Sequence, residues 1–331
     1  MGKPGFLTVM SVCCLILFPA WNLFSQNVSL PFPNSRFDTV EGIQVHYRIW
    51  NEQVDRPKGK ILFVHGFAGS TFCFRNLYDT LAMLGYKIVA VDLPGAGYSS
   101  RVMEFNQSHS NRARFLWKFL NGFEPADTSG WILVGHSMGG GTAEAMAIIS
   151  PERTRKLIIV AGTVFKKDNN MTGTVGFMFK QKKVKKMMIR YADRKLITYK
   201  KFNRLLKSVY SRKPDSTEVL GYLKPLELEG SSEAVINVFV NNKEIRDLDV
   251  RTLTGVPVLA IWGTKDNWVS LNTTRLTLAA FPDLKLVKIK GAGHSPMETH
   301  PEQFIPPFLE FISHPEKQPI FQNLKISSPV R

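Results

Sequence analysis

Short apolar runs alternate with helical stretches through the first half of the chain, and this alternation constrains the fold more than any other feature. Three runs, Ile61–Val64, Lys87–Val91 and Trp131–Val134, each end in glycine-rich or acidic residues. Apolar runs of this length are typical of parallel strands buried on both faces. Helical stretches at Phe74–Leu84 and Arg112–Leu120 separate them. The pattern therefore predicts a doubly wound, mostly parallel sheet.

The residues on either side extend this sheet. The turn pair Glu41-Gly42 lies between alternating residues at Phe37–Val40 and Ile43–Trp50, which predicts a β-hairpin before the first parallel strand. With 44% hydrophobic residues the chain can bury a large core, so a disordered or fibrous protein is excluded. Further strands and a closing helix are expected at Lys156–Ala161, Val258–Trp262, Lys285–Ile289 and Pro301–Ile312.

An unusually long segment separates two of the expected strands. About ninety residues lie between Gly162 and Gly255, whereas a crossover between parallel strands needs about a dozen. We therefore expect an inserted helical cap at residues 163–254, between core segments 29–162 and 255–315, with a tail at 316–331. The pattern favours cap helices at Phe177–Tyr191, Lys195–Tyr210 and Ser231–Val240.

The N-terminus and the cysteines bear on the cellular compartment. Lys3 precedes an uncharged run, Phe6–Phe24, which predicts a membrane-directed segment within residues 1–28. The small residues Ala20 and Ser25 each have a large residue two positions earlier, so an uncleaved anchor is favoured over a signal peptide, and a buried N-terminal helix is a third reading. We expect an exported protein, membrane-anchored or secreted (periplasmic). The only cysteines are Cys13, Cys14 and Cys73, which excludes a disulfide scaffold and a cysteine-ligated zinc site.

The expected strand at Trp131–Val134 runs directly into a glycine-rich turn that contains a serine. The residues after Trp131–Val134 are Gly135-His136-Ser137-Met138-Gly139, a G-x-S-x-G pentapeptide followed by an Ala-rich helix. A serine on such a strand-to-helix turn projects into a cleft, and the flanking glycines remove side chains that would clash. Ser137 is therefore the candidate nucleophile, the alternative being an ordinary glycine-rich turn.

Two other glycine-rich loops follow strands of the same sheet. In His65-Gly66-Phe67-Ala68-Gly69 the Phe67 N–H, together with the Met138 N–H, is the candidate donor pair for a developing oxyanion. The loop that begins at Asp92 contains two glycines, Gly95 and Gly97, but no Lys-Ser/Thr, so we interpret it as structural rather than as a phosphate loop.

A nucleophilic serine needs a base, and the base needs an orienting acid. His294 lies in Gly291-Ala292-Gly293-His294 directly after the last expected strand. Asp266 follows the strand Val258–Trp262 in a similar position. Asp92 is the competing acid, and Asp168 is a weaker one.

The order Ser137, Asp266, His294 and the motifs GHSMGG, HGF, WGTKDNWV and GAGHSPMETHPEQF resemble the α/β-hydrolase fold superfamily from about Phe37 to Ile312. The resemblance implies a Ser–His–Asp triad of Ser137, His294 and Asp266, an oxyanion hole and a cap over the site. The GHSMGG elbow is similar to that of monoacylglycerol lipases and small-ester hydrolases, and also to that of carbon–carbon bond hydrolases. The serine departs from the aspartate of haloalkane dehalogenases and epoxide hydrolases.

We therefore expect a serine hydrolase of carboxylic esters, acting on a lipid or small-molecule ester without a cofactor or metal. Carbon–carbon bond hydrolysis by the same triad is the alternative, and a non-catalytic ligand-binding member of the fold is a third reading.

The positive charge of the expected cap bears on what the cap binds. The formal net charge is +16, and Thr163–Lys213 contains sixteen Lys or Arg against two Asp. No nucleic-acid-binding module accompanies this charge, so nucleic acid is not the expected partner. The lysines of Lys180–Lys186 lie beside large apolar residues, as in a helix on an anionic membrane surface. The other reading is a solvated basic face whose apolar residues line an acyl pocket.

Overall fold

The computed structural model describes residues 30–123, 129–162, 184, 187, 189, 197–242 and 248–314. The chain divides into two compact units, Met1–Pro33 and Asn34–Arg331, and every strand and helix named below belongs to the second. The apolar segment Phe6–Phe24, the tail 316–331 and nearly all of the lysine-rich stretch Lys180–Lys186 lie outside the described residues. Among the residues that are described, no helix has the length and apolar character needed to cross a bilayer.

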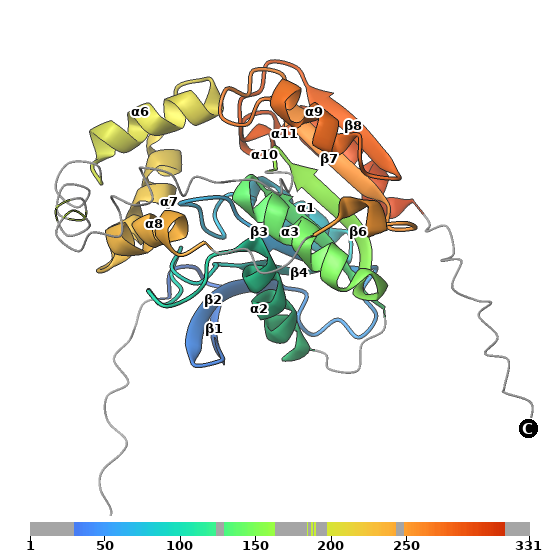
Figure 1. The fold of residues 1–331 in the computed structure, drawn as a ribbon, viewed down its shortest axis with the longest axis horizontal. Helices are drawn as coiled ribbons and strands as arrows, with labels where there is room; N and C mark the ends of the chain where they lie inside the picture. Colours follow the sequence, from blue (N-terminus) through green and yellow to red (C-terminus); the bar gives the residue numbers. More distant parts are fainter. Residues whose placement is uncertain are drawn as a thin grey trace, which may run out of the picture. The chain divides into compact units, whose positions relative to one another are not determined.

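The core is one eight-stranded sheet with the strand order β1-β2-β4-β3-β5-β6-β7-β8 (Figure 1). The first three strands in this order pair antiparallel, and all later neighbours pair parallel. The predicted strands are all present, with bounds that differ by no more than two residues. They are β1 Ser35–Val40, β2 Ile43–Trp50, β3 Lys60–Val64, β4 Lys87–Val91, β5 Trp131–His136, β6 Thr154–Val160, β7 Val258–Gly263 and β8 Leu284–Ile289.

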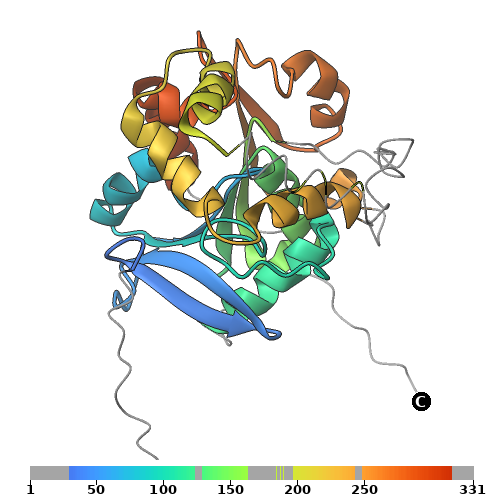
Figure 2. The same ribbon diagram turned by 90° about the vertical axis from the view of Figure 1, so that its left-hand side faces the viewer.

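The β1–β2 hairpin lies at one edge of the sheet (Figure 2). Its turn residues Glu41 and Gly42 have φ values of 51° and 78°. Positive φ at both central residues is the geometry that a two-residue turn needs to match the twist of its strands. The predicted hairpin is therefore confirmed.

Helices cover both faces of the sheet, so alternate strand residues enter two separate clusters. Leu62 and Val64 of β3 pack on the side of α2 and α3, whereas Ile61 and Phe63 pack on the side of α1 and α11. This double burial explains the continuous apolar strands and confirms the predicted doubly wound, mostly parallel sheet. The flanking helices are α1 Arg75–Met83, α2 His109–Asn121, α3 Met138–Ile149, α9 Leu271–Leu278, α10 Pro296–Thr299 and α11 Pro301–Ser313.

The chain between β6 and β7 contains three described helices, which we call the cap helices: α6 Tyr199–Tyr210, α7 Ser216–Leu226 and α8 Ser231–Val240. Figure 1 shows them grouped beside one another. The sequence pattern predicted α6 and α8 but not α7, which contains Gly221 and Pro225. A Cβ at Gly221 would lie 2.3 Å from the Phe72 ring, so this apparent helix breaker permits close packing on the core.

Candidate active site

The β5–α3 turn holds Ser137 in a strained conformation. Ser137 has φ 53° and ψ −122°, a region that non-glycine residues rarely adopt. A Cβ at Gly135 would lie 2.1 Å from the Gly139 carbonyl oxygen, and a Cβ at Gly139 would lie 2.3 Å from the Val64 oxygen. Both glycines are therefore required for the turn to pack against the sheet. The turn presents Ser137 at the carboxyl edge of the sheet and at the first turn of α3.

Ser137, His294 and Asp266 form a continuous hydrogen-bonded set, which we call the Ser137 array. The Ser137 Oγ lies 2.9 Å from His294 Nε2, and His294 Nδ1 lies 2.8 Å from Asp266 Oδ2. The three residues come from the ends of β5, β8 and β7. His294 and Asp266 are 6% and 8% exposed, so their hydrogen bond is shielded from water. The structure brings the three residues selected from the sequence within bonding distance.

The loop after Asp266 orients its carboxylate. Asp266 Oδ1 accepts the backbone N–H groups of Trp268 at 2.8 Å and Val269 at 2.9 Å, while Oδ2 faces His294. The Trp268 ring stacks near His294, with centroids 6.3 Å apart and planes 22° apart. Trp268 is 48% exposed and was not singled out from the sequence, although it lies only two residues after the candidate acid.

Two other histidines support the loops of the site. His136 donates from Nε2 to the His294 carbonyl oxygen at 2.9 Å, and His65 donates from Nδ1 to the Gly66 carbonyl oxygen at 2.7 Å. His65 Nε2 accepts the N–H of Leu93 at 3.0 Å. Burial lowers the pKa of His136 to about 3 and also lowers the pKa of His65. Both are therefore neutral near pH 7.

Asp92, the competing acid, belongs to a different network. Its carboxylate accepts His46 Nδ1–H at 2.7 Å and the backbone N–H groups of Thr71 at 2.6 Å and Tyr98 at 2.8 Å. His46 Nε2 in turn lies 2.7 Å from the Ser35 Oγ. We call Ser35, His46 and Asp92 the Ser35 array. Asp92 is thus not the partner of His294.

The weaker acid candidate, Asp168, lies outside the described residues. Cys73 is buried, and this burial raises the pKa of its thiol well above the ordinary value. Within the described part of the chain, no three His, Cys, Asp or Glu side chains are grouped as metal ligands would be.

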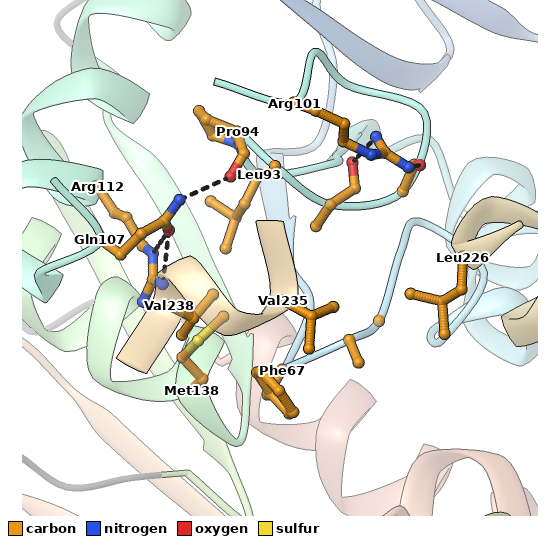
Figure 3. Close-up of a pocket in the computed structure, with 15 residues that line it drawn as sticks. Phe67, Leu93, Pro94, Arg101, Gln107, Arg112, Met138, Leu226, Val235 and Val238 are labelled. Carbon is orange, nitrogen blue, oxygen red and sulfur yellow. Dashed lines mark hydrogen bonds between the residues drawn. The ribbon is translucent and has the colours of Figure 1, made fainter. Parts of the chain in front are cut away.

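A pocket is lined by Met138, the residue that follows Ser137, and by Phe67 of the loop after β3 (Figure 3). Phe67 and Met138 lie on its core side, and Val235 and Val238 of α8 face them from the cap (Figure 3). Gly66 packs against the elbow, since a Cβ there would lie 3.0 Å from the Ser137 Cβ. The loop that contains Phe67 is therefore held directly against the serine.

The polar side chains of the pocket wall bond to the protein itself. The Gln107 side chain accepts two N–H groups of Arg112, at 3.1 and 2.8 Å, and donates to the Pro94 oxygen at 3.2 Å. Arg101 donates from Nη2 to the carbonyl oxygens of Gly97 at 2.7 Å and of Pro225 at 2.8 Å. Because these donors already have partners, the surface that remains for a ligand is mainly apolar.

Comparison with known proteins identifies relatives along most of the chain. The family model described as alpha/beta hydrolase fold matches residues 60–301. An uncharacterised hydrolase of Bacillus subtilis, YugF, is 28% identical over 284 residues, which cover 85% of this chain and 98% of that protein.

A 2-hydroxy-6-oxononadienedioate/2-hydroxy-6-oxononatrienedioate hydrolase of Paraburkholderia phymatum is 27% identical over 286 residues, which cover 82% of this chain and 91% of the relative. Among solved structures, a probable hydrolytic enzyme of Pseudomonas aeruginosa superposes with a TM-score of 0.69 at 18% identity, covering 86% of this chain and 96% of the other.

Proposed function

Because this chain belongs to the alpha/beta hydrolase fold family, we propose that it is a serine hydrolase of carboxylic esters. One observation carries the proposal. The Ser137 Oγ, on a strained turn, lies 2.9 Å from His294 Nε2, and the next residue, Met138, lines an apolar pocket. A serine hydroxyl becomes a useful nucleophile when a neutral imidazole accepts its proton in this geometry.

In the proposed reaction the Ser137 Oγ attacks the ester carbonyl carbon while His294 Nε2 takes its proton. Asp266 keeps the imidazole in the correct tautomer and stabilises the imidazolium ion that forms. The tetrahedral intermediate then expels the alcohol, which receives the proton from His294. Water attacks the resulting acyl-enzyme by the same route, and the products are the carboxylic acid and the free serine.

The backbone N–H groups of Phe67 and Met138 are the proposed oxyanion donors. Both residues line the pocket, and Met138 is the first residue of α3. The N-terminus of a helix favours negative charge, which supports this assignment of Met138. Each such donor contributes a factor of roughly 10² to 10³ in turnover.

The pocket supports an uncharged, apolar acyl group as the substrate moiety. The cap side supplies Leu226, Val235 and Val238, and the wall arginine Arg101 donates to protein oxygens. The second candidate is carbon–carbon bond hydrolysis with the same residues, because the Paraburkholderia relative has such a substrate in its name. That name denotes a dicarboxylate, for which an apolar pocket offers few partners, so the ester reaction is favoured.

We also propose that the enzyme is exported and that its cap contacts an anionic lipid surface. Lys200, Lys201, Arg204 and Lys207 are exposed on α6, which contains no acidic residue. Each basic side chain near an anionic surface contributes about 1 kcal/mol of binding free energy. An enzyme that collects lipid esters would gain local substrate concentration from this contact.

The function is tested with p-nitrophenyl esters from acetate to palmitate, with and without anionic vesicles, together with labelling by a fluorophosphonate. We expect ester turnover, labelling of wild-type protein and no labelling of Ser137→Ala. Turnover of a 2-hydroxy-6-oxo dienoic acid with negligible ester hydrolysis would select the carbon–carbon reaction. Absence of labelling would indicate a ligand-binding protein without this chemistry.

The lipid contact needs a separate comparison. Lys201→Gln removes a charge from α6, and Lys288→Gln removes an exposed charge from the edge strand β8 as the matched control. We expect Lys201→Gln to weaken binding to anionic vesicles by up to about fivefold, and Lys288→Gln to leave it unchanged. Equal binding by both variants would contradict the proposal.

A further inference from the structure

The C-terminal turn of α6 lies against both loops that carry the acid and the base. We call Ser208–Ser211 the α6 brace. The Val209 carbonyl oxygen accepts the His294 N–H at 2.7 Å. The Ser211 hydroxyl donates to the Lys265 carbonyl oxygen at 3.3 Å, one residue before Asp266. The brace therefore ties together two loops that reach the site from separate strands.

The contact between the brace and the histidine loop is close. A Cβ at Gly293 would lie 2.5 Å from the Val209 oxygen and 2.8 Å from the Ser211 Oγ. The Trp268 ring, which stacks near His294, also donates from Nε1 to the Ser208 Oγ at 3.2 Å. Figure 1 shows α6 extending toward the side of the sheet formed by β7 and β8.

The buried side chain of Glu298 also bonds to the C-terminal turn of α6. Glu298 lies in α10, four residues after His294, and is 4% exposed. It accepts the Tyr210 hydroxyl at 2.8 Å and the Tyr222 hydroxyl of α7 at 2.6 Å, and it pairs with Arg75. The helix that follows His294 is thus bonded to the brace and to the next cap helix.

We propose that the α6 brace positions the Asp266–His294 pair, and that Tyr210 is a positioning residue acting through Glu298 and Val209. This inference rests on the proposed function and names what aligns its acid and base. A misplacement of the reacting groups by about 1 Å lowers turnover by up to roughly 10²-fold, so the brace controls the rate of acyl transfer more than substrate affinity.

Two matched variants test the proposal. Tyr210→Phe and Tyr222→Phe each remove one phenol from the same carboxylate, but only Tyr210 lies in the brace. Turnover of the full-length enzyme is normalised to the number of sites titrated by a fluorophosphonate. We expect Tyr210→Phe to lower kcat roughly tenfold with KM within about twofold, and Tyr222→Phe to keep kcat within about twofold. Equal kcat in the two variants would overturn the proposal.

A spectroscopic measurement separates this proposal from the hydrolase assignment. Each carboxylate-bound imidazole Nδ1–H, in His294 and in His46, should give a low-field proton resonance without any substrate, and His294→Ala assigns the first. We expect Tyr210→Phe to shift or broaden the His294 resonance and to leave the His46 resonance unchanged. An unchanged His294 resonance would contradict the brace, whereas a wild-type protein that is not labelled by fluorophosphonate would contradict the proposed function instead.

Discussion

The Ser137 array and the Ser35 array have nearly the same hydrogen bonds. The serine-to-Nε2 distance is 2.9 Å in the first and 2.7 Å in the second, and the Nδ1-to-carboxylate distance is 2.8 Å and 2.7 Å. Bond lengths alone therefore do not distinguish the two sets.

The two sets differ in the surroundings of the serine and in what covers the histidine. Ser35 is 1% exposed, while His46 and Asp92 are fully buried, and the rings of Phe37 and Tyr98 lie 5.1 and 5.4 Å from the His46 ring. Ser35 is part of strand β1, whereas Ser137 has a positive φ on the β5–α3 turn, where the next residue, Met138, lines a pocket.

The difference indicates that the same Ser–His–Asp arrangement can serve two roles, one structural and one chemical. In the Ser35 array the three groups satisfy one another, so the edge hairpin is bonded to the loop after β4 without a buried polar group left unpaired. A nucleophile needs in addition a substrate pocket, a projecting hydroxyl and nearby donors for an oxyanion. Of the two serines, Ser137 is the one on a strained turn, next to a residue that lines a pocket.

The largest expected contrast is between the two serines. Ser137→Ala should lower kcat for a p-nitrophenyl ester by roughly 10⁵- to 10⁶-fold with little effect on stability. Ser35→Ala should keep kcat within about twofold while lowering the free energy of unfolding by about 1–3 kcal/mol, because His46 loses its partner. Turnover and urea unfolding measure both. A Ser35→Ala protein that is folded but inactive would break the comparison.

The two acids should differ in a similar way. Asp266→Asn is expected to lower kcat by roughly 10⁴-fold, because an amide stabilises the wrong tautomer of His294. Asp92→Asn leaves one acceptor oxygen for three donors, so we expect a loss of about 1–3 kcal/mol in unfolding free energy for each unpaired donor. Turnover per titrated site should stay within a few-fold in Asp92→Asn, and thermal unfolding reports its stability.

Acid sensitivity sharpens the comparison, because His136 adjoins only the Ser137 array. Its pKa falls from 6.5 to about 3 on burial in the folded protein. As the pH falls below 6.5, His136 becomes protonated in the unfolded chain but stays neutral in the folded protein. The free energy of unfolding therefore falls until about pH 3. The slope for this one group is about 1.4 kcal/mol per pH unit. Urea unfolding at several pH values should show a shallower slope in His136→Gln, and an identical slope would contradict the assignment.

The smallest expected effect concerns the cover of the Ser35 array. Phe37 is 39% exposed and packs against His46, so Phe37→Ala should lower the unfolding free energy by about 1 kcal/mol. We expect Ser35 to remain unlabelled by fluorophosphonate in Phe37→Ala/Ser137→Ala, with Ser137→Ala as the control. Labelling of Ser35 in the double variant, detected by mass spectrometry, would mean that burial alone keeps it inert.

Most of the sheet and the Ser137 array followed from local patterns. Apolar runs identified the central strands β3 to β7, since a strand buried on both faces shows its burial along a few consecutive residues, whereas the turn pair Glu41-Gly42 identified β1 and β2. Ser137 was selected by the G-x-S-x-G pentapeptide between a strand and a helix. Asp266 and His294 were selected by their positions just after strands. Parallel strands place their carboxyl ends at one edge, so these three positions could be expected to meet before any distance was known.

Other features depend on contacts between distant parts of the chain. The Ser35 array joins His46 to Asp92 across 46 positions, and the α6 brace joins Tyr210 to Glu298 across 88. The sequence offered Asp92 as a competing acid for the same base. The structure shows that Asp92 bonds to His46 instead of His294.

The sequence by itself thus determined the fold class, the strands, Ser137 and His294, because each is encoded in a short stretch. The tertiary structure decided which acid faces His294, which side chains line the pocket and what braces the base. Those outcomes depend on the packing of the cap helices against loops far away in the chain, and no local pattern of residues records such a contact.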